Sequence, residues 1–282
     1  MKIRFGPSGN SASFYDQGYT STKQAPQWLY EMGLDAFEYS FGKGVRITEQ
    51  TAREIGVPMA EYDIALSIHA PYYINLATPE VDKAKNNVRF LLESARAASW
   101  MGAKKIILHP GSCGGRDRRE ALKYAMERTK TAMAVLIDNG YGGMALCPET
   151  MGKGNQLGLL EEILEICLLD EKLIPCIDFG HLHARGIGSL KSEEDFADIL
   201  DAVEKELGKK RLDNIHIHFS RVEYTDAGEK KHWDFKDTQF GPDFIHLASQ
   251  IKARDMHPVV ICESQTRMAE DALAMKKMYL EA

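Results

Sequence analysis

Short apolar stretches recur along this chain, and each is followed by a longer segment with helical periodicity. The stretches are almost continuously apolar, which is typical of strands buried on both faces. Residues 81–101 show the helical pattern well, because Val88, Leu91, Ala95 and Ala98 fall on one face of a helix. The expected strands cover residues 2–5, 36–39, 65–69, 105–109, 144–148, 175–178, 214–218 and 259–263.

The expected helices alternate with these strands. They cover residues 21–32, 48–55, 81–101, 118–139, 157–168, 193–207, 242–253 and 268–280. Eight such alternations predict an α/β fold, a closed (β/α)8 or TIM barrel. An open doubly wound sheet would carry a Gly-rich phosphate turn after its first strand, and residues 6–10 (GPSGN) lack that pattern. Because no Pro-, Gly- or Ser-rich linker divides the chain, we expect a single TIM-barrel domain over residues 1–282.

The composition adds constraints on location. The chain is 44% hydrophobic and 27% charged, which is ordinary for a soluble globular protein. Its longest apolar stretches are strand-sized, so we expect no membrane span, and its first residues have no apolar signal-peptide core. Five cysteines are scattered without Cys-x-x-Cys spacing, which predicts reduced thiols and a cytoplasmic protein.

The formal net charge is −6, from 35 basic and 41 acidic residues. Taken alone, this value argues against a general nucleic-acid binder, which is usually basic. Three divalent ions bound at one site would add six positive charges there. The net charge therefore does not exclude DNA as a partner.

Six consecutive expected strands, the third to the eighth, end in a side chain that can bind a metal ion. Barrel enzymes place their active site at this end of the strands, so side chains far apart in sequence would meet there. Each alone could be a hydrogen-bonded structural residue, but grouped carboxylates repel one another unless a cation neutralises them. The mixed donor set suits zinc, with manganese or iron possible. The six side chains are His69, His109, Glu149, Asp178, His216 and Glu263.

Two further histidines, His183 and His218, each lie two residues beyond a stronger candidate. We expect both to support the ligands by hydrogen bonding and not to bind metal themselves.

With these motifs, the chain resembles the endonuclease IV family of apurinic/apyrimidinic DNA endonucleases along essentially its whole length. The matching blocks appear in the family's order. They are HAPYYINL from His69, HPGS from His109, PETMGKG around Glu149, IDFGH from Asp178 to His181, IHIHFS around His216, and ES from Glu263.

The resemblance implies a trinuclear zinc site. His69 and His109 would bind the first ion, Glu149 would bridge it to the second, and Asp178, His216 and Glu263 would complete the second. His181 and His232 would bind the third ion together with an Asp two residues before the last His. That position is Lys230 here. Either Glu229 or Asp226 replaces the carboxylate, or His183 contributes, or the third ion is weakly held.

The resemblance also implies a zinc-dependent DNA-repair hydrolase that cleaves the phosphodiester 5′ to an abasic site. A hydroxide bridging two metal ions would be the nucleophile, with Glu149 and Glu263 as the catalytic carboxylates. Tyr72 would enter the damaged duplex, since an abasic nucleotide is cheap to extrude. Basic residues at the same rim would contact the DNA backbone, and we expect a monomer without a protein partner. The basic candidates are Arg46, Lys153 and Arg221, then Lys43, Arg185 and Lys231.

Two other functions remain open from the sequence. A sugar or sugar-phosphate isomerase or epimerase of the xylose-isomerase-like barrels needs one ion, which Glu149, Asp178, His216 and Glu263 would also hold, with the two glutamates as the acid/base pair. Such an enzyme has less use for the other histidines. A purely structural zinc site is the third possibility, but such sites are usually rich in cysteine, and no cysteine is among these candidates.

Overall fold

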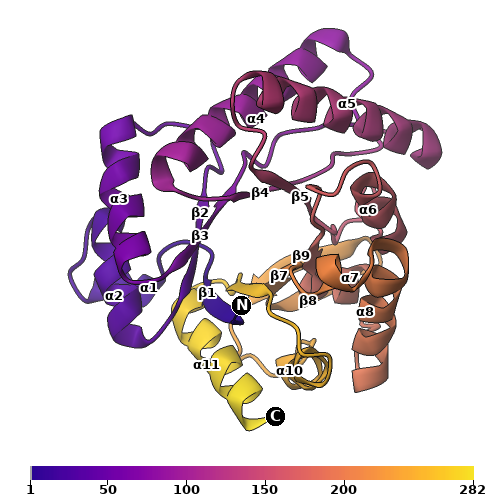
Figure 1. Ribbon diagram of the computed structural model, residues 1–282. Helices are drawn as coiled ribbons and strands as arrows, with labels where there is room; N and C mark the ends of the chain where they lie inside the picture. The colour runs from indigo at the N-terminus through magenta and orange to yellow at the C-terminus, as the bar shows by residue number, and fades with distance from the viewer. Residues whose placement is uncertain (1) are drawn as a thin grey trace.

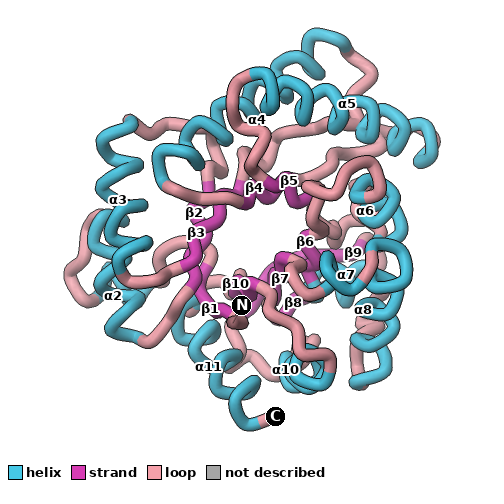
Figure 2. Tube along the Cα trace, in the orientation of Figure 1, coloured by secondary structure: helices cyan, strands magenta, loops and turns pink. Residues whose placement is uncertain are grey.

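The computed structural model, which describes residues 2–282, has eight parallel strands in a ring with helices outside it (Figures 1 and 2). The (β/α)8 barrel predicted from the sequence is therefore confirmed. The barrel strands are β1 (Arg4–Pro7), β2 (Ala36–Ser40), β3 (Ala65–His69), β4 (Lys105–Leu108), β5 (Ala145–Pro148), β6 (Cys176–Asp178), β7 (His216–Phe219) and β10 (Val259–Cys262).

Two four-stranded sheets, in the orders β1-β10-β7-β6 and β2-β3-β4-β5, make up the barrel. They join at two places. Ser8 bridges to Glu38 beyond β1, and Glu149 bridges to Cys176 beyond β5. The backbone N–H of Thr150 donates to the Cys176 carbonyl at 3.0 Å across the second junction. These bonds close the sheet, and closure brings the C-terminal ends of the strands together at one rim.

The helices surround the ring, and several begin at polar caps. The carboxylate of Asp117 accepts the N–H groups of Arg119 and Glu120 at the start of α5 (Arg118–Asp138), and Thr48 accepts the N–H of Thr51 at the start of α3 (Glu49–Glu61). Among residues 2–282, none of the helices is both long enough and apolar enough to cross a membrane. The longer helices are α2 (Ala25–Met32), α3 (Glu49–Glu61), α4 (Val81–Met101), α5 (Arg118–Asp138), α6 (Leu160–Cys167), α8 (Glu193–Leu207), α10 (Phe244–Ala253) and α11 (Met268–Glu281).

Several elements were not predicted. Three are short helices, α1 (Ala12–Asp16), α7 (Phe179–Arg185) and α9 (Lys209–Leu212). The helix expected over residues 21–32 begins with a 3-10 turn over Thr22–Gln24 before α2. The largest is an antiparallel hairpin of β8 (Arg221–Thr225) and β9 (Gly228–Trp233), which follows β7. Because both strands carry many charged residues, their sequence lacks the apolar pattern by which the barrel strands were recognised.

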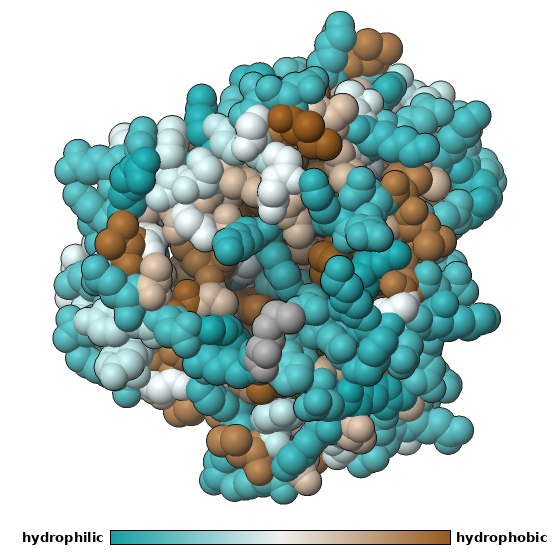
Figure 3. All heavy atoms as spheres, viewed as in Figure 1, coloured by the Kyte–Doolittle hydropathy of each residue, from teal (hydrophilic) through white to brown (hydrophobic). Residues whose placement is uncertain are grey.

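Most of the core lies between the barrel and its helices, where Leu91, Ala95 and Ala98 of α4 are fully buried, as the helical pattern predicted. Hydrophilic side chains cover most of the face shown in Figure 3, and hydrophobic ones are scattered over it. The inside of the barrel is different. Glu38, Ser67 and His218 are buried there, although branched apolar side chains usually fill this space.

Candidate metal centre

The first donor group at the rim consists of His69, His109 and Glu149, from the ends of β3, β4 and β5. Oε2 of Glu149 lies 3.2 Å from Nε2 of His69 and 3.2 Å from Nε2 of His109. Nδ1–H of His69 donates to the Ala70 carbonyl at 2.8 Å, which leaves Nε2 as the ring nitrogen that faces the group. Three donor atoms, contributed by three neighbouring strands, therefore face one small space.

The second group consists of Glu149, Asp178, His218 and Glu263. Oε1 of Glu149 lies 3.1 Å from Nδ1 of His218, which in turn lies 3.6 Å from Oε2 of Glu263. The two oxygens of Glu149 thus face two different groups, the arrangement expected of a bridging carboxylate. Asp178 uses Oδ1 to accept the N–H of His181 at the start of α7, and its Oδ2 lies 3.3 Å from Nδ1 of His181.

The position expected of His216 is occupied by His218. Strand β7 runs from His216 to Phe219, so His218 lies nearer the rim. Side chains two residues apart on a strand share a face, and His216 therefore also points inward but deeper in the barrel, with its ring centroid 5.2 Å from that of His218. Its Nε2 lies 2.9 Å from Oε2 of Glu38. The structure therefore brings His218, and not His216, together with Glu149, Asp178 and Glu263, whereas the sequence analysis expected His216 there and gave His218 a supporting role.

The third group consists of His181, Glu229 and His232. Glu229 lies between the two imidazoles, with Oε2 3.5 Å from Nε2 of His181 and Oε1 3.6 Å from Nε2 of His232. Nδ1–H of His181 donates to the Thr150 carbonyl at 2.9 Å, so its Nε2 is also directed to the group. Of the replacements considered for the missing Asp, the structure places Glu229 here.

Lys230 and His183 lie outside this third group. Strand β9 has a bulge at Lys230, because Glu223 pairs with Lys231 and Tyr224 pairs with Glu229. Lys230 is the extra residue, and its ammonium donates to Oε1 of Glu223 at 2.5 Å. Nδ1 of His183 accepts the N–H of Leu190 at 3.1 Å. Burial lowers the pKa of His183 to about 4, so this ring stays neutral.

The charges of the metal-free site are strongly coupled. Burial lowers the pKa of His69, but the neighbouring Glu149 carboxylate outweighs burial and raises that pKa to about 9. Burial also lowers the pKa of His232, but the neighbouring Glu229 carboxylate outweighs burial and raises that pKa to about 9. Burial raises the pKa of Glu229, yet His232 and His181 bring it down to about 2. Protons on the imidazoles thus balance the carboxylates when no cation is present.

The donor atoms fit divalent cations. Oδ2 of Asp178 is buried and has no hydrogen-bond partner in the part of the chain that the structure describes. A buried carboxylate oxygen without a partner is costly, and a cation facing it removes that cost. Carboxylate oxygens and imidazole nitrogens together are the donors that zinc and similar ions prefer. The three groups could therefore hold up to three ions, with Glu149 shared between two of them.

A cavity of about 350 Å³ opens from these groups to solvent. Tyr72 and Lys153, two of the candidate DNA contacts, line it together with His109 and Glu263. The Tyr72 side chain is 58% exposed. Arg46 is exposed in the loop after β2 but does not line the cavity.

Arg221 and Arg185 do not have the free positions expected of DNA contacts. The guanidinium of Arg221 is mostly buried, pairs with Asp243 and donates to the Phe240 carbonyl. Arg185 donates to carbonyls of the loop after β5, including that of Met151 at 3.0 Å. Both arginines stabilise loops at the rim. No sequence pattern indicates this role, because their partners are backbone carbonyls and a distant Asp.

Comparison with known proteins agrees with this fold. The model of the xylose isomerase-like TIM barrel family matches residues 26–279. An uncharacterized protein of Methanocaldococcus jannaschii is 33% identical over 286 residues, which cover 100% of this chain and 98% of that protein. A probable endonuclease 4 of Shouchella clausii is 30% identical over 172 residues. That alignment covers 58% of this chain and only 56% of the relative.

Two solved structures share the fold at low sequence identity. One is a D-tagatose 3-epimerase-like protein, with a TM-score of 0.69, 19% identity and coverage of 90% of this chain and 91% of the other. The other is endonuclease IV from Thermus thermophilus, with a TM-score of 0.67, 18% identity and coverage of 93% of both chains. At such identities the likeness concerns the fold.

Proposed function

The chain belongs to the xylose isomerase-like TIM barrel family, and from this premise we propose that it is a metal-dependent DNA-repair endonuclease that hydrolyses the phosphodiester 5′ to abasic sites. The observation that carries the proposal is the position of Glu149. Its two oxygens face two separate donor groups, and a third group of His181, Glu229 and His232 lies beside them. Several adjoining ions suit phosphodiester hydrolysis, in which charge develops on both the attacking and the leaving oxygen.

The proposed ligands divide among three ions, of which zinc fits the donors best and manganese or iron is possible. Bound ions would supply Lewis acidity and lower the pKa of a coordinated water. The first ion would be held by His69, His109 and Glu149, the second by Glu149, Asp178, His218 and Glu263, and the third by His181, Glu229 and His232.

The protein's own side chains have separate roles in this mechanism. Glu263 is partly exposed at the cavity, with an 18% exposed side chain, and can take a proton from an attacking water. Glu149 is almost fully buried, so it positions the two groups that it bridges. Tyr72 offers an exposed ring that can occupy the space left by a missing base, and Lys153 can contact a phosphate.

A nicking assay tests the proposal. Purified protein with zinc or manganese is incubated with duplex DNA that contains one tetrahydrofuran abasic analogue, a substrate that cannot undergo β-elimination. We expect a nick on the 5′ side that leaves a 3′ hydroxyl which a DNA polymerase can extend. Glu263→Gln is the control for the catalytic carboxylate. The proposal is wrong if the protein nicks this DNA no faster than Glu263→Gln does.

A second candidate function is a single-metal sugar or sugar-phosphate epimerase. Glu149, Asp178, His218 and Glu263 alone form a four-residue set for one ion, with two glutamates as an acid/base pair. Counting the metal ions at the rim groups separates the candidates, because one rim ion per chain supports the epimerase and two or three rim ions support the nuclease. Exchange of a carbon-bound proton of a ketose with deuterated water is the matching activity test.

A further inference from the structure

A second group of metal-binding side chains lies inside the barrel, below the rim. It consists of Glu38 on β2, Cys176 on β6, and His216 and His218 on β7. All four residues are fully buried. Polar side chains are costly in the middle of such a barrel unless they have partners. This group therefore needs a physical explanation that the rim does not provide.

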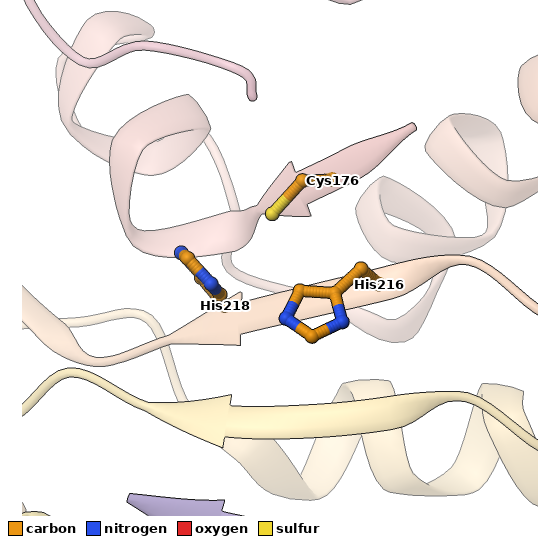
Figure 4. A group of neighbouring side chains, drawn as sticks. All are labelled: Cys176, His216 and His218. Atoms are coloured by element: carbon orange, nitrogen blue, oxygen red, sulfur yellow. The ribbon is translucent and has the colours of Figure 1, made fainter. Parts of the chain in front are cut away.

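The donor atoms of the group converge. The thiol of Cys176 and one ring nitrogen from each of His216 and His218 all lie within 4.8 Å of one another. Figure 4 shows the thiol of β6 and the two rings of β7 around one space. Glu38 is not one of these three mutually close donors, but its carboxylate faces both rings, with Oε2 2.9 Å from Nε2 of His216 and Oε1 3.0 Å from Nε2 of His218.

Two of these atoms are close without being hydrogen-bonded. Oε1 of Glu38 and Nε2 of His218 are buried, and neither has a hydrogen-bond partner among the described residues, although they lie 3.0 Å apart. Two nitrogen or oxygen ligands of one zinc ion lie about this far apart, because each lies about 2.0–2.2 Å from the metal. A divalent ion between them would satisfy both lone pairs.

We propose that Cys176, His216, His218 and Glu38 bind a buried divalent ion of the zinc class, separate from the ions at the rim. One thiolate, two imidazoles and one carboxylate make a four-coordinate set that zinc accepts. Binding releases the thiol proton, and the thiolate and the Glu38 carboxylate together neutralise the two charges of the ion. The ion would tie β2, β6 and β7 together, and so join the two four-stranded sheets.

His218 connects this interior site to the rim. Its Nδ1 faces Glu149 and Glu263, and its Nε2 faces Glu38. With ions at both sites, His218 would serve the rim through Nδ1 and the interior ion through Nε2, and its neutral ring would release its one N–H proton to solvent. The interior ion would then hold His218 in the orientation that the rim requires.

Cobalt spectroscopy tests this proposal. Metal-free full-length protein is titrated with Co²⁺ under a phosphine reductant, because a thiol reductant would itself bind cobalt. The three rim groups contain no cysteine, so a thiolate-to-cobalt charge-transfer band in the near ultraviolet can come only from a cysteine site. We expect this band in the wild-type protein. Its absence at saturating cobalt would overturn the proposal.

Two variants identify the thiol. Cys176→Ser should abolish the band, and Cys147→Ser should retain it, since Cys147 is an equally buried cysteine on the neighbouring strand β5. A band that persists in Cys176→Ser would contradict the assignment. If Cys176→Ser does not fold, a variant with only Cys176 left is used, and it must keep the band. Its other cysteines, Cys113, Cys147, Cys167 and Cys262, are replaced.

This test is independent of the nuclease proposal. The spectrum is recorded without DNA, and the rim ligands give no thiolate band. A protein that shows the band but does not nick abasic DNA would retain the interior site and lose the proposed function. A protein that nicks abasic DNA without showing the band would support the proposed function and rule out the interior site.

Discussion

Glu149 has the most constrained position of all the rim residues. Its side chain is 1% exposed, and His69, His109, His181 and His218 all lie within 3.5 Å of its two oxygens. These imidazoles outweigh burial and hold the pKa of Glu149 well below its usual range. A carboxylate that stays ionised inside the protein and faces two donor groups is suited to bridge cations.

Glu149→Gln should therefore remove a shared ligand from two proposed ions. We expect nicking of abasic DNA to fall by more than about 100-fold, because even outer-shell partners of metal ligands cost 10–100-fold when removed. Elemental analysis should show the loss of at least one ion per chain. The matched control is Glu161→Gln, at the start of helix α6 away from the rim groups, which should keep full activity and metal content.

Tyr72 offers a residue-scale test that does not involve the metals. Tyr72→Ala should weaken binding to abasic duplex about 10–100-fold, because one aromatic stack on nucleic acid contributes about 1–3 kcal/mol. Metal content should not change. Tyr30→Ala is the matched control, since Tyr30 is also 58% exposed but lies on helix α2 and stacks on Tyr62. Equal losses in the two variants would show that Tyr72 has no special role.

The sequence predicted most of the rim residues, and its errors at this scale have clear causes. His69, His109 and Glu149 were found because each follows an apolar strand. His216 was chosen over His218 because both face inward, and an error of one or two residues in a strand end changes which of them reaches the rim. The sequence could not show whether Arg221 is free to contact DNA, because its pairing with Asp243 depends on tertiary structure.

At the scale of elements, the β8–β9 hairpin decides whether a third ion can bind. On a regular strand, a carboxylate two residues before His232 would lie on the same face as His232. Here the bulge at Lys230 lets Glu229, three residues before His232, reach that face. The charged hairpin has no apolar alternation, so the sequence alone left Glu229, Asp226 and His183 as alternatives.

The hairpin geometry predicts different outcomes for neighbouring residues. Glu229→Gln should lower the metal content by about one ion per chain in elemental analysis, because a neutral amide is a poor ligand. Lys230→Ala should leave it unchanged, since the Lys230 ammonium is paired with Glu223 away from the group. Asp226→Asn serves as a second control. A loss of metal in Asp226→Asn, but not in Glu229→Gln, would contradict the proposed third group.

At the scale of the whole molecule, the alternation of strands and helices was sufficient to predict the barrel. Its polar interior was not predicted, because Glu38, Cys176 and His216 lie in short strands whose other residues are apolar. A single polar residue in such a strand does not reveal which distant strand it will face. Only closure of the ring lets the inward-facing side chains of β2 and β7 meet inside the barrel.

The coupled charges predict how the stability of the metal-free protein depends on pH. His69 and His232 have folded-state pKa values of about 9, above the ordinary 6.5. Their contribution is fully present below pH 6.5 and is lost as the pH rises through 9. His183 and His216 have folded-state pKa values of about 4, so their contribution is lost as the pH falls below 6.5. The metal-free protein should therefore be most stable near pH 6.5.

Thermal and urea unfolding in the presence of a chelator should show this maximum, with a loss on the order of 3 kcal/mol from each of His69 and His232 in the free energy of unfolding between pH 6.5 and 9. His69→Gln should flatten the decline, and His246→Gln, on outer helix α10, should not. Zinc should reverse the trend above pH 6.5, because it replaces the imidazole protons and binds more tightly as they are lost. A decline of equal size with and without zinc would mean that the cation does not bind at these histidines.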